Sequence, residues 1–156
     1  MLLNRNLSII LLLLDYRLSL HELVSLQMKH VHFENNTISI SKDSKTNRTI
    51  HLNEKDKLHL YTYYNDIPKS IRPKYHSNDP LFVAFDSCRK TYYWSYDDDA
   101  LKSLAEVSVQ KMIRLEIERT NLRKGISAQH FHNTFILRKF KKRIDKNRLD
   151  SNRIIP

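Results

Sequence analysis

The positively charged side chains are the residues of this sequence whose type and spacing most clearly indicate a chemical role. One group lies late in the chain, with members one or two residues apart: Arg138, Lys139, Lys141, Lys142 and Arg143. A second group consists of Lys42 and Lys45, which lie between two alternating segments, and Arg48, which begins the second of them. Lysine and arginine neutralise phosphates along a nucleic-acid backbone. Both groups therefore predict contacts with DNA; a solvated turn or tail is the alternative for each.

The net charge is concentrated in the last part of the chain. The 27 basic and 17 acidic residues of the whole sequence give a net charge of +10. Residues 1–100 carry 13 basic and 12 acidic residues, whereas residues 101–156 carry 14 basic and 5 acidic residues. This asymmetry suits a polyanion such as nucleic acid, or an acidic membrane surface. A solubilising face is the plainer explanation.

Composition excludes several classes of protein. A single cysteine, Cys88, leaves no internal disulfide, and a single glycine, Gly125, leaves no Gly-rich phosphate loop. The eight-residue apolar run 7–14 is too short for the roughly 20 residues that span a bilayer, and no cleavage site follows it. We therefore expect a cytoplasmic protein without a membrane span. The histidine pairs lack further ligands, so we expect no metal and no cofactor.

Hydrophobic spacing predicts the elements that position these cations. A buried helix is expected over about residues 4–15, and a second helix from Ser19, which forms a capping-box pattern with Glu22 and continues to about Val31. Strict alternation over 37–41 and 48–52 predicts a β-hairpin. A third helix is expected from a cap at Asn53 to about residue 65, with three residues inward, Leu58, Tyr61 and Thr62.

The second half of the chain reads as loops followed by helices. Residues 66–80 form a proline-rich loop, 81–85 a short buried extended segment and 90–100 a loop. The aromatic group of that last loop, Tyr92, Tyr93, Trp94 and Tyr96, could stack on unpaired bases, but packing onto the core is favoured. Helices are expected from caps at Ser108 and Ser127. The predicted class is α+β, mainly α, as one domain over 1–146 and a basic tail over 147–156.

Several strings, in this order, resemble the catalytic domain of the tyrosine recombinases, the phage-integrase family. Together they cover about residues 4–140, and they are Asn6–Leu14, Glu22–Leu26, Val31–Ile40, Arg48–Asn53, Ser108–Met112 and Gly125–Phe135. The resemblance implies a helical domain with a small antiparallel hairpin, acting in DNA recombination and integration. In that family a tyrosine attacks the scissile phosphate, and two arginines, histidines and a lysine surround it. Guanidinium forks match the charge of a transferring phosphoryl group.

The resemblance assigns this sequence only remnants of the family's first site residues. The first family arginine belongs to T-G-L-R-x-S-E-L. Aligned on Glu22 without a gap, its position is Ser19; with a two-residue insertion, Arg17 supplies an arginine. The family lysine lies in the hairpin turn, which makes Lys42 the first choice and Lys45 the second.

The second family cluster, S-P-H-D-L-R-H-T-F, keeps its frame but loses its chemistry. Gln129 stands for the first histidine, His132 for the arginine and Asn133 for the next histidine. A mostly neutral imidazole cannot replace an always-charged guanidinium. No G-H pair follows, and the last tyrosine is Tyr96. His132, Arg17 and Lys42 are therefore expected as remnants of a degenerate, truncated catalytic site.

These observations predict a DNA-binding protein of the integrase and recombinase type that does not cleave DNA on its own. Its expected partner is double-stranded DNA, and it is expected to be a monomer in isolation and to derive from a mobile element. One alternative is a modulator of an intact tyrosine recombinase, or a subunit to which such a partner supplies the missing nucleophile. Another is a basic interaction domain unrelated to DNA.

Overall fold

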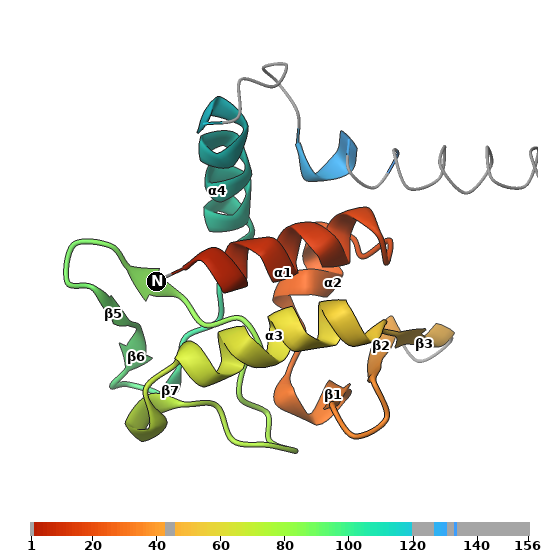
Figure 1. Cartoon of the computed structure of the whole chain (residues 1–156). Coiled ribbons are helices and arrows are strands. Elements are labelled where there is room, and N and C mark those ends of the chain that lie inside the picture. Colours follow the sequence, from red (N-terminus) through yellow and green to blue (C-terminus); the bar gives the residue numbers. More distant parts are fainter. Residues whose placement is uncertain (1, 43–45, 120–126, 131–132, 134–156) are drawn as a thin grey trace, which may run out of the picture.

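The computed structural model describes residues 2–42, 46–119, 127–130 and 133 (Figure 1). The described elements are, in chain order, α1 (Leu3–Leu14), α2 (Leu20–Val24), the 3₁₀ helix η1 (Met28–His30), β1 (Val31–His32), β2 (Thr37–Lys42), β3 (Thr46–His51), α3 (Glu54–Asp66), the 3₁₀ helix η2 (Lys69–Ile71), β4 (Phe85–Asp86), β5 (Thr91–Tyr92), β6 (Trp94–Ser95), β7 (Ala100–Leu101) and α4 (Glu106–Arg119). Helices combined with small antiparallel sheets confirm the mainly helical α+β class.

The first helix, α1, lies between α3 and α4 (Figure 1). Its side chains Ile9, Leu12 and Leu13 are buried, as the apolar run predicts. Two consecutive hydrogen bonds between polar side chains also join α1 to α4. The Nη2 of the buried Arg5 donates to Oδ1 of Asn6 at 3.1 Å, and Nδ2 of Asn6 donates to Oε1 of Glu116 at 3.0 Å. The N-terminal helix therefore organises the core of the domain.

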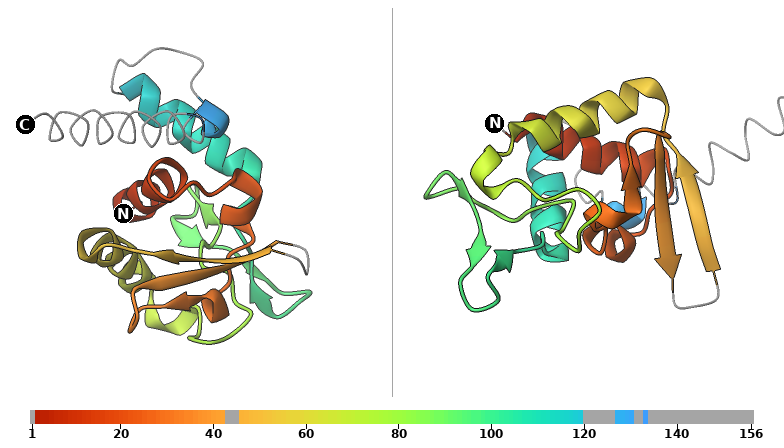
Figure 2. Two further views of the ribbon diagram at one scale, coloured as in Figure 1. Left: turned by 90° about the vertical axis from the view of Figure 1, so that its right-hand side faces the viewer. Right: turned by 90° about the horizontal axis from the view of Figure 1, so that it is seen from below.

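A three-stranded antiparallel sheet in the order β1-β2-β3 contains the predicted hairpin, which extends away from the helices (Figure 2). Ile38 lies opposite Ile50, and both are buried together with Ile40 and Leu52. The alternation of the sequence therefore predicts the correct face. The edge strand β1 is a feature that the sequence does not predict.

The helix expected from Ser19 to Val31 is much shorter in the structure, because α2 ends at Val24. The backbone that follows forms hydrogen bonds with the proline-rich loop instead. Met28 N donates to Asp79 O at 2.9 Å, and Leu81 N donates to Leu26 O at 2.9 Å. These long-range bonds replace the helical bonds that the local spacing suggests.

The helix α3 begins at its predicted cap but buries a different face. Oδ1 of Asn53 accepts from the backbone N of Asp56 at 2.8 Å. Leu58 and Tyr61, expected inward, are 60% and 42% exposed. The buried residues are Leu60, Tyr63 and Tyr64. Apolar residues lie on several faces of this helix, and packing against α1 selects among them (Figure 1).

The region from residue 81 to residue 104 has more strand structure than predicted. Leu81, Phe82 and Val83 are buried, as expected for an extended core segment. The loop after them forms two small antiparallel pairs, β4–β5 and β6–β7. Of its aromatic group only Tyr92 is buried, whereas Tyr96 is 90% exposed. The predicted packing onto the core therefore applies to Tyr92 and not to the exposed members of the group.

The helix α4 starts one turn earlier than predicted. The backbone N of Ser108 and that of Val109 both donate to Ala105 O, so Ser108 lies inside the helix rather than at its cap. The predicted apolar face is correct, with Val109, Met112, Ile113 and Ile117 buried. No helix among the described residues is long and apolar enough to cross a membrane.

Candidate functional site

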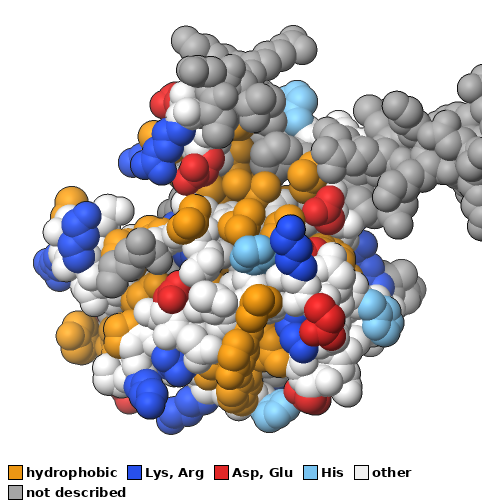
Figure 3. Space-filling model, viewed as in Figure 1, with side chains coloured by type: hydrophobic (Ala, Val, Ile, Leu, Met, Phe, Trp, Pro, Cys, Tyr) orange, Lys and Arg blue, Asp and Glu red, His pale blue; other side chains and the backbone are white. Residues whose placement is uncertain are grey.

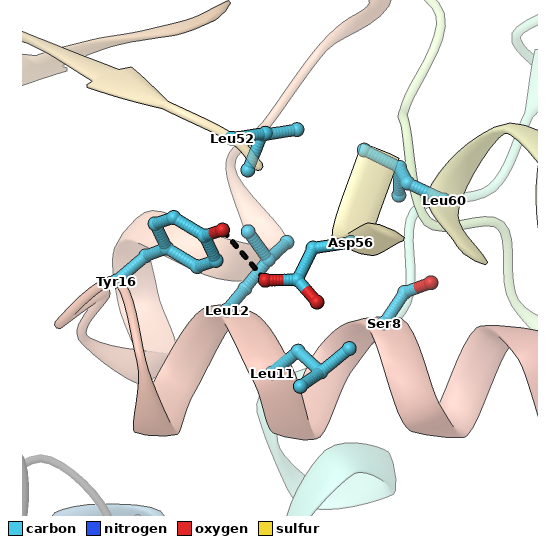
Figure 4. Close-up of a pocket in the computed structure, with 7 residues that line it drawn as sticks. All are labelled: Ser8, Leu11, Leu12, Tyr16, Leu52, Asp56 and Leu60. Atoms are coloured by element: carbon cyan, nitrogen blue, oxygen red, sulfur yellow. Dashed lines mark hydrogen bonds between the residues drawn. The ribbon is translucent and has the colours of Figure 1, made fainter. Parts of the chain in front are cut away.

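The turn between α1 and α2 carries the residues that the resemblance assigns to the first arginine, and Tyr16 anchors it to α3. The Tyr16 hydroxyl donates to Oδ2 of Asp56 at 2.6 Å (Figure 4) and accepts from the backbone N of Asn53 at 3.1 Å. Burial, followed by the hydrogen bond to Asp56, raises the pKa of Tyr16 to about 12. The phenol therefore remains a hydrogen-bond donor at neutral pH.

Arg17 occupies a left-handed backbone conformation in this turn. Its φ is 60°, a region that favours glycine. The Arg17 side chain is exposed, whereas the next residue, Leu18, is fully buried. Because Leu18 fixes the turn from inside, the backbone of Arg17 has little freedom to relax.

The carboxylate of Glu22 and the guanidinium of Arg48 join this turn to the sheet. Glu22 Oε2 accepts from Ser19 N at 2.8 Å, and Ser19 Oγ accepts from Glu22 N at 3.2 Å, which is the predicted capping box. Arg48 Nη2 donates to Glu22 Oε2 at 2.9 Å and to Arg17 O at 3.1 Å. Arg48 therefore supports the turn from β3, and its predicted contact with DNA remains a prediction.

A pocket of about 140 Å³ lies where the start of α2 meets α4 and residues 127–129. Its lining consists of Ser19, Leu20, Gln110, Ser127, Ala128 and Gln129. The polar groups among these side chains are hydroxyls and amides. They can donate hydrogen bonds to a phosphate oxygen, but none carries a charge or titrates near neutral pH.

Local hydrogen bonds hold the far wall of the pocket. The backbone N of Ser127 donates to Nδ1 of His130 at 3.2 Å, and His130 N donates to Ser127 O at 3.0 Å. Gln129 Nε2 donates to Oδ1 of Asn133 at 3.1 Å. The two residues that the resemblance assigns to the family histidines, Gln129 and Asn133, are therefore bonded to each other as a pair of neutral amides.

The structure describes only part of the predicted site. Ser19 and Gln129 both line the pocket, whereas Arg17 is not among the lining residues. Lys42 is the last residue of β2, where its backbone pairs with Thr46. The other predicted residues lie outside the described part of the chain: Lys45, His132, Arg138, Lys139, Lys141, Lys142 and Arg143.

Gln110 is a pocket residue that sequence reasoning missed. It lies on α4 beside the buried Val109 and is exposed to the pocket side. Gln110 lies in the first turns of the helix whether α4 starts at Glu106 or after a cap at Ser108, and no local motif distinguishes it from the other polar residues there. Within the described residues, no group of three or more histidine, cysteine or acidic side chains could hold a metal ion.

Several solved recombinases and integrases have a fold similar to that of this chain. The chain matches XerA recombinase with a TM-score of 0.60 and 16% identity, over 85% of this chain and 42% of that chain. The chain also matches XerH site-specific recombinase bound to difH substrate with a TM-score of 0.63 and 20% identity, over 91% of this chain and 37% of that chain. The fold is that of a tyrosine-recombinase catalytic domain.

A third similar structure is the integrase from mycobacterium phage Brujita, with a TM-score of 0.55 and 18% identity over 85% of this chain and 36% of that chain. No family model and no curated protein sequence matches the chain. The chain thus spans 36–42% of the lengths of these three structures. The tyrosine-recombinase resemblance is confirmed at the level of the fold.

Proposed function

We propose that this chain binds duplex DNA as a protein of the integrase and recombinase type and that these 156 residues do not cleave a strand on their own. One observation carries the proposal. Within a recombinase fold, the pocket brings together Ser19 and Gln129, the positions assigned to the first arginine and the first histidine. Neutral hydrogen-bond donors at those positions can seat a phosphate without neutralising the charge that develops during its transfer.

The conformation of Arg17 supports the ungapped alignment of the first motif. In T-G-L-R-x-S-E-L, the residue two positions before the arginine is glycine, and the ungapped alignment places Arg17 there. Arg17 has the positive φ that glycine favours, and the buried Leu18 matches the leucine between them. Ser19 then stands at the arginine position, so the described residues that line the pocket include no guanidinium.

The absence of an arginine at position 19 is expected to slow phosphoryl transfer. Removing one such donor from an oxyanion site typically costs about 10²–10³ in rate. Covalent cleavage also needs a tyrosine, and the residues after Tyr96 contain none. Tyr96 itself is followed by three aspartates, whose charges would repel a phosphate. DNA binding without covalent chemistry fits this combination.

The excess of cations after residue 100 supports the DNA-binding part of the proposal. If about five of them meet phosphates, the logarithm of affinity should fall with the logarithm of salt concentration at a slope of roughly −4 to −5 on duplex DNA. A basic tail over 147–156, a core over 1–146, a mobile-element origin and a cytoplasmic location belong to the same proposal. An intact recombinase as a partner is the alternative that keeps a role in strand transfer.

The first test measures duplex binding as a function of salt. The basic residues Lys139, Lys141, Lys142 and Arg143 are replaced together by alanine, and we expect a clearly flatter slope. The matched control removes two exposed cations of the β4–β5 turn, Arg89 and Lys90, and should leave the slope unchanged. A flat salt response of the unmodified protein would contradict DNA binding.

The second test uses a set of duplexes that each carry a nick at a different position, since a nick next to a cleaved phosphate traps any covalent intermediate. We expect no protein–DNA adduct that survives denaturant. An adduct formed by this chain alone would overturn the non-cleaving part of the proposal. An adduct on an intact recombinase whose yield rises when this chain is added would favour the partner alternative.

A further inference from the structure

Four aromatic rings form a cluster around the helix α3, over which Figure 3 shows hydrophobic side chains. We define this cluster as the aromatic strip: Phe33, Tyr61, Tyr64 and Tyr75. The strip combines the turn after β1, the helix α3 and the loop after η2. Tyr61 is 42% exposed and Tyr75 is 45% exposed, whereas Tyr64 is buried beneath them.

The strip is a fixed surface rather than a set of loose side chains. The ring of Phe33 meets Tyr61 edge to face at 5.3 Å between centroids, and Tyr75 packs against Tyr64 at 4.9 Å. The hydroxyl of Tyr64 donates to Pro73 O at 3.0 Å. Arg72 lies over the Tyr64 ring at 5.3 Å and donates through Nη2 to Ile67 O at 2.9 Å. Little side-chain entropy would be lost when a flat ligand binds here.

Cations lie beside the exposed rings and outnumber the carboxylates in the loop after α3. Residues 67–79 carry Lys69, Arg72 and Lys74 and one acidic residue, Asp79, whose Oδ2 accepts from the backbone N of Lys74 at 2.8 Å. Lys74 directly precedes Tyr75, and Lys57, which pairs with Glu54 at 3.1 Å, lies one helical turn before Tyr61. Glu34 is the acidic residue next to Phe33, and it lies 3.6 Å from Nδ1 of His32. Aromatic faces beside cations suit a ligand that presents flat bases and phosphates together.

A second exposed aromatic group has the opposite electrostatic setting. Tyr96 is 90% exposed, but Asp97, Asp98 and Asp99 follow it directly. Three carboxylates beside the ring repel a phosphate backbone. Exposure of a tyrosine alone therefore does not distinguish the two groups; the charge around it does.

We infer that the aromatic strip binds single-stranded nucleic acid, with unpaired bases stacked on Tyr61 and Tyr75 and the backbone phosphates near Lys74. Stacking suits every base, because each has a π face, so binding is independent of sequence. This surface contains no residue of the pocket lining and acts on a different form of nucleic acid. It therefore goes beyond the proposed binding of duplex DNA.

The test measures binding of a fluorescein-labelled oligothymidylate of about 15 nucleotides, with a duplex of equal length in parallel. Replacing Tyr61 and Tyr75 together by alanine should weaken single-strand binding at least about ten-fold, since each stacked base typically contributes that order of effect. The double phenylalanine variant keeps both rings and should bind within about two-fold of the unmodified protein, because stacking needs the ring. Tyr96→Ala is the matched control and should change nothing.

Lys74→Gln separates the charge from the ring. It should lower the slope of log affinity against log salt concentration by about 0.7 for single-strand binding, because one phosphate contact contributes about that much. A hydroxyl-radical footprint on the unmodified protein avoids any effect of substitution on folding. The oligonucleotide should protect Tyr61 and Tyr75 and leave Tyr96 reactive.

Three results would overturn the inference. The first is unchanged single-strand affinity of the double alanine variant, or no protection of the two tyrosines. The second is an equal loss on single-strand and duplex DNA, which would make the strip part of a general DNA surface. The third is loss of self-association in the alanine variant at unchanged affinity, which would assign the strip to contact between copies. Failure of duplex binding alone contradicts the proposed function and not this inference.

Discussion

The positive φ of Arg17 has an energetic cost that a glycine at this position would not have. A residue with a Cβ atom in the left-handed region costs about 1 kcal/mol relative to glycine. We therefore expect Arg17→Gly to raise the free energy of unfolding by about 0.5–1 kcal/mol in urea denaturation followed by circular dichroism. Lys90, with a φ of 57°, should respond in the same direction.

Arg89→Gly is the matched control, because Arg89 is an exposed arginine that directly precedes Lys90 and does not have a positive φ. It should leave stability unchanged or lower it, since glycine gains entropy in the unfolded chain. A loss of stability in Arg17→Gly would show that its side chain contributes more than its backbone angle costs, and would weaken the ungapped alignment.

The Tyr16 hydroxyl gives the turn a dependence on alkaline pH. Its pKa is about 12 in the folded protein, against about 10 for a free tyrosine, because burial and the Asp56 carboxylate both oppose ionisation. A raised pKa means that the folded state binds the proton more tightly. The stabilisation is therefore complete below about pH 10 and is lost as the pH rises toward 12.

Tyr16→Phe isolates this contribution from other tyrosines, such as Tyr75, whose pKa burial also raises to about 12. The unmodified protein should be more stable than the variant at pH 8, and the difference should shrink between about pH 10 and 12. Urea denaturation at several pH values measures it. A difference that stays constant up to about pH 11.5 would mean that the hydrogen bond to Asp56 does not control the ionisation.

Residues in local patterns were predictable from the sequence, and residues with distant partners were not. Ser19 and Glu22 are three apart, so their capping box follows from the spacing alone. Arg48 reads as one of several cations after a hairpin turn. Its ion pair with Glu22 joins residues 26 apart and depends on how the sheet packs against α2.

At the scale of elements, α3 shows what propensity cannot decide. Its two-sided apolar pattern forms a helix in either orientation, and contact with α1 determines that Leu60 is buried at 2% exposure while Leu58 is 60% exposed. We expect Leu60→Ala to lower the free energy of unfolding by about 2–5 kcal/mol, through lost burial and the cavity that remains.

Leu58→Ala is the same substitution on the opposite face and should stay within about 0.5 kcal/mol of the unmodified protein. Urea denaturation of both variants compares the faces directly. Equal losses would return Leu58 to the inward face that the sequence alone predicts.

The same physical reason explains which elements were foreseen. The β2–β3 hairpin and the start of α3 depend on alternation and capping within a few residues, and both were predicted. The end of α2 depends on backbone bonds between residues 26–29 and 77–81, so a local pattern extends the helix too far. The pocket depends on three separate segments, and its lining includes Gln110, which no local motif marks.

For the whole molecule, the balance between charge and exposed apolar surface governs self-association. A net charge of +10 on 156 residues opposes contact between copies when salt is low. Two of the exposed apolar surfaces of the described residues are the aromatic strip and the outer side of α4, where Val107 is 75% and Leu115 is 44% exposed. Charge repulsion extends about 10 Å at 0.1 M salt and about 3 Å at 1 M. Added salt therefore weakens this repulsion more than it weakens apolar contact.

We therefore expect a monomer of 18.7 kDa in sedimentation velocity at micromolar concentration and low salt, without DNA. Any association should increase with salt, because screening removes repulsion and leaves apolar contact intact. Val107→Ser with Leu115→Ser, compared with the alanine variant of the strip, would show which surface is responsible. A tight dimer that forms at low salt and dissociates as salt rises would contradict the prediction, because charges of opposite sign would then hold the copies together.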